Sequence, residues 1–152
     1  MKYKYIFFAL LVLLASNALA SEDKNLGLGI ILGEPTGITG KYIIDEDSAI
    51  DAGAGWKTSG TDKFHIYGDY LYHLNDIFDV SKGKLPLFFG AGIRYVSNED
   101  DDDELGIRLP VGLEYVFQNV PIRVFGELVP VLDLTPDTEL DMEGGVGIRY
   151  FF

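Results

Sequence analysis

From Ser21 to the last residue, the chain is a succession of short segments in which apolar and polar residues alternate with a period of two. Residues 105–117 show the pattern clearly, because Leu105, Ile107 and Leu109 alternate with glycine, arginine and proline. A period of two is the mark of a β-strand with two different faces. Residues rich in Gly, Pro, Asn and Asp separate the segments at fairly even spacing, as turns do. The pattern predicts an all-β chain with eight antiparallel strands at 26–33, 36–44, 48–58, 63–74, 85–97, 105–117, 121–134 and 141–152.

The two faces of these strands differ sharply in charge. No predicted strand has a charged residue on its apolar face, and all four arginines fall on the other face. A soluble sandwich or barrel also alternates, with its apolar face inward, so alternation alone leaves the direction open.

Three features favour a membrane barrel with its apolar face outward. Most predicted strands reach the ~9–11 residues that cross a bilayer at a tilt. The polar face mixes glycine with long charged side chains, which suits a narrow lumen. The apolar face is rich in aromatic residues near strand ends, as interfacial girdles are: Tyr42, Trp56, Phe64, Tyr72, Tyr95, Tyr115, Phe117, Tyr150 and Phe152. In hydrocarbon such a sheet must close on itself, so the prediction is an eight-stranded transmembrane β-barrel.

The first twenty residues have the layout of a secretory signal peptide. Lys2 and Lys4 precede an apolar core at residues 6–15, and Ala18 and Ala20 frame a small-x-small cleavage site. Residues 1–20 are therefore predicted to be removed, leaving residues 21–152 as one barrel domain in the cell envelope. A retained anchor helix is the less favoured alternative, because the apolar core is short.

Composition excludes several classes of function. The chain has 12 basic and 24 acidic residues, and this negative charge disfavours a nucleic-acid partner. It has no cysteine, which excludes thiolate chemistry, disulfides and lipidation at a cysteine.

The charges on the polar face would project into the lumen. The strongest candidates for a lumenal ion-pair network are Asp51, Asp69, Arg94, Arg108, Glu114, Arg123, Glu127 and Arg149; Lys41, Lys57, Asp133 and Glu143 share this face. Assumed hairpin geometries place Glu114 opposite Arg123 and Glu127 opposite Arg149. Buried charges are tolerable when paired, so the set predicts a salt-bridged plug. A polar conduit or proton relay is the weaker interpretation, since eight strands leave little room beyond side chains.

No catalytic, cofactor or metal site is predicted. His65 and His73 share one face of a predicted strand but are eight residues apart, roughly 26 Å at ~3.3 Å per residue, too far to bind one ion. The acidic run from Glu99 to Glu104 lacks the spacing of a dedicated calcium loop, so we expect at most weak divalent cation binding there. The serines have neither a nucleophile-elbow motif nor an acid and histidine at workable spacing.

Pro110 and Pro130 fall inside predicted strands, where each removes a donor from the hydrogen-bond ladder. A bulge near a rim is the preferred interpretation. The alternative is an open seam through which lipids reach the lumen.

The C-terminal segment Gly144-Gly145-Val146-Gly147-Ile148-Arg149-Tyr150-Phe151-Phe152 resembles the signal recognised by the outer-membrane barrel insertion machinery. Its alternate positions are Val146, Ile148, Tyr150 and the terminal Phe152. The segments 27–38 and 108–113 also resemble short bacterial outer-membrane barrel proteins of the OmpA- and OmpX-like eight-stranded architecture. This resemblance implies a fold and a Gram-negative outer-membrane location, and it brings no agreed activity.

The predicted function is a non-catalytic structural or surface-binding role, with outer-membrane lipids and the insertion machinery as partners. Two alternatives belong to other classes. A lipid-modifying barrel enzyme needs a nucleophile and base at one rim, and a soluble periplasmic lipocalin-like carrier needs an apolar interior.

Overall fold

The structure is a computed structural model that describes residues 24–57, 63–98 and 102–152. The predicted signal peptide and its cleavage residues lie outside this range, as does the stretch from Glu99 to Asp101. The strands are β1 (Leu26–Glu34), β2 (Thr36–Ile43), β3 (Ser48–Trp56), β4 (Phe64–Leu74), β5 (Leu87–Ser97), β6 (Glu104–Arg108), β7 (Val111–Val116), β8 (Ile122–Thr135) and β9 (Glu139–Phe151). Within the described residues, no helix is long and apolar enough to cross a membrane.

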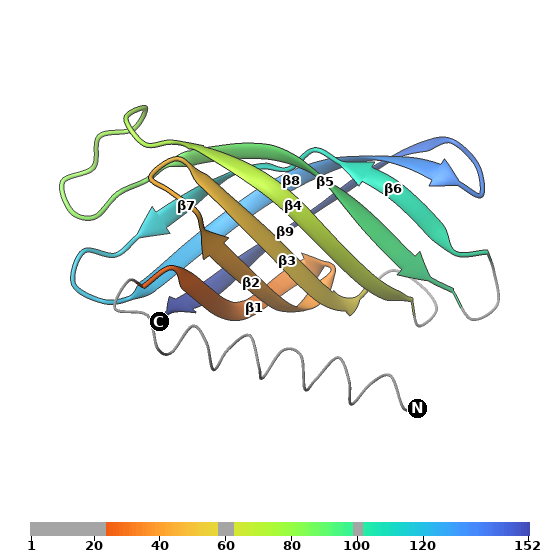
Figure 1. Ribbon diagram of the computed structural model, residues 1–152, viewed down its shortest axis with the longest axis horizontal. Coiled ribbons are helices and arrows are strands. Elements are labelled where there is room, and N and C mark those ends of the chain that lie inside the picture. The colour runs from red at the N-terminus through yellow and green to blue at the C-terminus, as the bar shows by residue number, and fades with distance from the viewer. Residues whose placement is uncertain (1–23, 58–62, 99–101) are drawn as a thin grey trace.

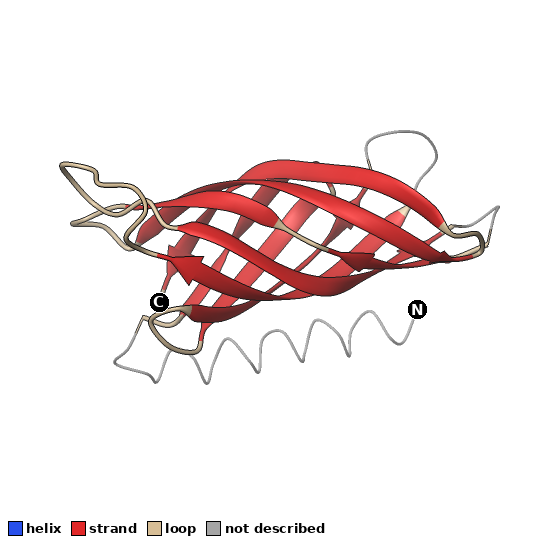
Figure 2. Cartoon of the chain, turned by 90° about the horizontal axis from the view of Figure 1, so that it is seen from above, coloured by secondary structure: helices blue, strands red, loops and turns tan. Residues whose placement is uncertain are grey.

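The strands form a closed antiparallel ring (Figures 1 and 2). Neighbours follow the order β4, β3, β2, β1, β9, β8, and then β6 with β7, which both pair with β8 and β5. The pairing of β4 with β5 closes the ring. Because β6 and β7 are successive halves of one interrupted strand, the barrel has eight strands, and the predicted fold class is confirmed.

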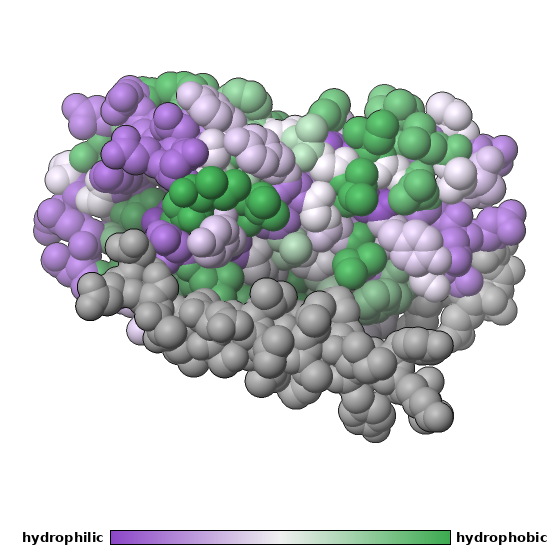
Figure 3. All heavy atoms as spheres, in the orientation of Figure 1, coloured by the Kyte–Doolittle hydropathy of each residue, from purple (hydrophilic) through white to green (hydrophobic). Residues whose placement is uncertain are grey.

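The barrel exposes its apolar face and buries its charged one. Leu128 and Ile93 are 63% and 62% exposed, whereas Arg94, next to Ile93 in β5, is 1% exposed. On the visible surface, hydrophilic residues gather at both ends, and patches of hydrophobic residues lie between them (Figure 3). This arrangement is the reverse of a lipocalin, so the alternative of a carrier with an apolar interior is wrong.

Aromatic pairs lie near both ends of the apolar surface. Trp56 packs against Phe64 at one end, with ring centroids 5.9 Å apart. At the other end Tyr150 packs against Phe152 at 5.1 Å, and Tyr115 against Phe117 at 4.8 Å. These pairs match the interfacial girdles of a membrane barrel.

The two prolines leave the ladder in register, which corrects both interpretations made from sequence. Leu109 N–H donates to the Pro130 carbonyl at 2.9 Å, and Gly90 N–H donates to the Pro110 carbonyl at 3.0 Å. The pairings on either side, Arg108 with Val131 and Val111 with Leu128, belong to one continuous register. Each proline therefore removes one donor without a bulge or an open seam. The pairing of β6 with β8 does contain a register shift, but it lies between Leu105 and Gly106, at the start of β6 and away from both prolines.

The two ends of the barrel differ. The described chain begins and ends at one of them, which also carries the connections 44–47, 75–86 and 117–121 (Figure 1). We call this the terminal mouth. The turns that follow β1 and β8 lie at the opposite end, and the first of these is the single residue Pro35.

Candidate functional site: the charged lumen and its mouth

All eight residues predicted for the lumenal network lie on the inner face of the barrel. Seven are buried, and Arg123, at the terminal mouth, keeps 24% of its side chain exposed. Glycines on the same face make room for long side chains: a Cβ at Gly53 would lie 2.5 Å from the Tyr67 ring, opposite it on β4. The predicted combination of glycine with bulky inward residues is thus confirmed at this position.

Glu114 is the hub of the network near the terminal mouth. Its carboxylate accepts hydrogen bonds from Lys41 Nζ at 3.0 Å and from Arg123 Nη1 at 3.1 Å, and Arg149 Nη1 lies 3.8 Å away. Lys41 Nζ is also 2.6 Å from His73 Nε2. Glu114 is fully buried, so one carboxylate balances three cations from three different strands.

Two arginines fill the middle of the lumen. Arg149 donates to Asp51 Oδ2 at 3.1 Å and to Thr39 Oγ1 at 2.7 Å, and its guanidinium lies 4.0 Å from the Phe125 ring centroid. Arg108 donates through Nε to Asp69 Oδ1 at 2.8 Å, and its guanidinium lies 3.8 Å from the Tyr67 ring centroid. Stacking on aromatic faces adds a cation–π attraction to the ion pairs.

Arg94 organises the end opposite the terminal mouth. It donates to Asp133 Oδ1 at 2.6 Å and is in close contact with Glu143. Lys57 joins this group through Asp141 at 3.4 Å. His65 Nε2 lies 3.7 Å from Glu143. The charged side chains at this end therefore come from several strands, among them β4, β5, β8 and β9.

Neither predicted facing occurs, although Glu114 and Arg123 do form an ion pair. Arg123 bonds Glu114, although the ladder places Arg123 opposite Val116 and Glu114 opposite Phe125. Glu127 lies opposite Gly145 rather than Arg149, so the predicted facing of Glu127 and Arg149 does not occur.

The centre of the lumen is less completely paired than the sequence suggested. Asp51 and Asp69 are directly opposite each other on β3 and β4, an unfavourable position for two like charges. One oxygen of each carboxylate, and both Nη atoms of Arg108, have no hydrogen-bond partner among the described residues. Glu127 has Arg108 as its ion-pair partner, at 3.7 Å. His65 and Glu143, toward the opposite end, also have side-chain atoms without a hydrogen-bond partner in the described part of the chain, so pairing is most complete near the terminal mouth.

The structure separates the two histidines into different environments, as the spacing predicted. His73 contacts Lys41 near the terminal mouth, and His65 lies near Glu143. The described residues contain no group of three or more His, Asp or Glu side chains able to hold a metal ion. From the acidic run, Asp103 accepts hydrogen bonds from Tyr95 Oη and from Asn98 N–H, so its carboxylate is engaged within its own hairpin.

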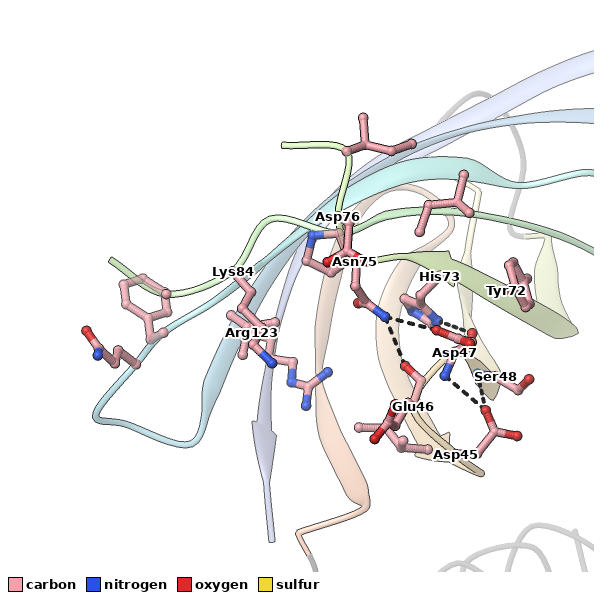
Figure 4. Close-up of a pocket in the computed structure, with 18 residues that line it drawn as sticks. Asp45, Glu46, Asp47, Ser48, Tyr72, His73, Asn75, Asp76, Lys84 and Arg123 are labelled. Carbon is pink, nitrogen blue, oxygen red and sulfur yellow. Dashed lines mark hydrogen bonds between the residues drawn. The ribbon is translucent and has the colours of Figure 1, made fainter. Parts of the chain in front are cut away.

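The terminal mouth contains a pocket of about 1090 Å³ that the sequence analysis missed. Its walls come from the connections 44–47 and 75–86, from residues 116–118, and from Arg123 at the start of β8 (Figure 4). No motif marks it, because separate connections meet there only when the ring closes. The one signal in the sequence was the unusual length of the connection after Leu74.

Comparison with solved structures gives a similar fold and no more than a fold. The chain is similar to the crystal structure of the N-terminal β-barrel domain of Pseudomonas aeruginosa OprF, with a TM-score of 0.58 and 16% sequence identity. The match covers 84% of this chain and 94% of that one. No protein family model matches the sequence, and no curated protein does.

Proposed function

We propose that this chain is an integral outer-membrane β-barrel with a non-catalytic, structural role, whose lumen is closed by an ion-pair plug. The observation that supports this most directly is the inverted burial: exposed apolar side chains surround buried, paired charges. Water would penalise that surface, whereas hydrocarbon favours it. Outer-membrane lipids are then the main partners of the outer wall.

The chain's two ends fit the same proposal. Residues 1–20 would direct export across the inner membrane, and Val146, Ile148, Tyr150 and Phe152 would present the insertion signal. The first three lie on the exposed face of β9, and Phe152, the residue after it, is also exposed. If the terminal mouth faces the periplasm, residues Asp102 to Glu104 of the acidic run lie on the cell surface, as does the Pro35 turn.

The location is tested by fractionating cells that express the full chain. We expect the mature protein to begin near Ser21 and to stay with outer membranes after a high-salt wash. Unheated samples should migrate differently from boiled samples on gels, because a closed barrel resists unfolding by detergent. Recovery in the soluble periplasmic fraction would contradict the proposal.

The plug is tested by electrical recording in planar bilayers. We expect no steady ion current, because an eight-stranded barrel has room for little more than side chains and Arg94, Arg108 and Arg149 fill this one. Heat-modifiable migration of the same preparation serves as the control for insertion. Stable conductance steps that follow protein concentration would show a conduit instead of a plug.

A further inference from the structure

The pocket at the terminal mouth sorts its charged residues onto two walls (Figure 4). Arg123 and Lys84 lie on one side of it. Asp45, Glu46 and Asp47 lie on the other, with His73, and Asp76 lies near Lys84. Its volume is about 1090 Å³, similar to that of pockets that hold small molecules.

The basic wall is held in position with donors to spare. One Nη of Arg123 donates to Glu114, and the guanidinium lies 4.3 Å from the Phe151 ring centroid. Its other N–H groups have no acceptor among the residues that the structure describes. Lys84 is fixed through its backbone, which exchanges two hydrogen bonds with Val116 at 2.8 and 3.0 Å, and its side chain is exposed.

The acidic wall is also ordered. Asp45 accepts hydrogen bonds from the N–H groups of Asp47 at 2.9 Å and Ser48 at 2.8 Å, and these bonds hold the pKa of its carboxyl below the usual value. Asn75 Nδ2 donates to the Glu46 carbonyl and to Asp47 Oδ1, both at 3.1 Å, and so ties the connection 44–47 to the start of the connection 75–86. The carboxylates of Glu46 and Asp76 have no ion-pair partner within the described residues and are exposed.

We propose that this pocket binds a zwitterionic ligand, with its anionic group on Arg123 and Lys84 and its ammonium group on the acidic wall. A simple anion would meet the three carboxylates of Asp45, Glu46 and Asp47 across the pocket, and a simple cation would meet the two basic side chains. A ligand with both charges satisfies both walls. Two sources supply such a ligand: a short peptide with free ends, or the phosphoethanolamine headgroup of a lipid.

The binding test uses the refolded mature chain in maltoside micelles, because this detergent carries no charge. Trialanine is a suitable peptide probe, since three residues span roughly 10 Å, about the width of such a pocket. N-acetyl-trialanine and trialanine amide each lack one charge. Glycerophosphoethanolamine represents the headgroup. Binding is followed by titration of backbone amide signals by NMR.

We expect a zwitterionic probe to give saturable shifts at Lys84, Arg123, Glu46 and Asp76, and each blocked peptide to bind at least about tenfold more weakly than trialanine. Tighter binding of glycerophosphoethanolamine than of trialanine would identify the headgroup as the source. Equal binding of blocked and unblocked trialanine would overturn the proposal, as would saturation by neither zwitterion.

Matched variants separate the pocket from general surface charge. Lys84→Gln and Glu46→Gln are expected to weaken binding about two- to fivefold, the effect of losing a partly exposed ion pair. Lys82→Gln and Asp79→Asn, in the connection 75–86 but outside the pocket lining, should leave binding unchanged. Equal effects of the lining and control variants would contradict the assignment. The test requires only a folded barrel, so its outcome is independent of where the protein resides in the cell.

Discussion

Replacing Glu114 with alanine is expected to lower the free energy of unfolding in lipid vesicles by at least about 3–5 kcal/mol, the cost of breaking a buried ion pair. Glu114 is fully buried and holds Lys41 and Arg123 at hydrogen-bond distance, with Arg149 at 3.8 Å. Its removal leaves these cations without their shared carboxylate. Urea unfolding of the refolded protein measures the effect.

Two further variants make this prediction specific. Glu127→Ala should cost less than Glu114→Ala, because Glu127 has one ion-pair partner, at 3.7 Å. Glu139→Ala, at an exposed position at the start of β9, should change stability by no more than ~0.5 kcal/mol. A Glu114→Ala variant as stable as Glu139→Ala would mean that bulk water reaches this carboxylate, contrary to the plug.

Replacing Leu128 with arginine is expected to cost ~2–4 kcal/mol in the same assay, because the charge would face hydrocarbon near the middle of the bilayer. Leu128 is 63% exposed and lies in the middle of β8, opposite Val111 and Gly144 on the two neighbouring strands. The outward direction of its side chain is the reason for the large effect.

Leu140→Arg is the matched control. Leu140 is 75% exposed but is the second residue of β9, near a rim, where the same change should cost only ~0–1 kcal/mol. A barrel surrounded by water would tolerate both arginines equally. Equal stabilities of the two variants would therefore contradict the membrane assignment of the apolar surface.

The sequence was sufficient to predict the faces of the strands because a β-strand has a side-chain period of two. An error of one residue in register would move every arginine to the lipid, so the alternation itself determines which residues are inside. All four arginines lie on the inner face. The positions of the eight strands followed from the same alternation and from the turn residues between its segments.

The partners inside the lumen could not be predicted in the same way. A hairpin register can shift by two or four residues and keep every side chain on its face, and both shifts occur. At the β7–β8 hairpin, Phe117 N–H donates to the Ile122 carbonyl at 3.3 Å, so the turn is formed by residues 118–121 and is longer than the assumed two-residue turn. At β8–β9 the register differs by four, which moves Gly145 to the place expected for Arg149.

The candidate pocket escaped prediction for a different reason. Its walls belong to connections far apart in sequence, and their residues follow no periodic pattern. The length of the loop after Leu74 shows that something other than a tight turn is present. It does not reveal that Lys84 and Glu46 would lie on opposite sides of one mouth.

The ion pairs of the lumen join parts of the chain that are far apart in sequence, and this has a consequence for how the barrel folds. Lys41 and Glu114 are separated by 73 positions, and Arg149 and Asp51 by 98. Contacts of such long range form late, after the entropy of closing large loops has been lost. Until β1 meets β9, these charged side chains have no enclosed lumen to enter and remain hydrated. Ring closure and burial of the charges are then a single cooperative event, and the slow step of folding is the one that brings the two ends of the chain together.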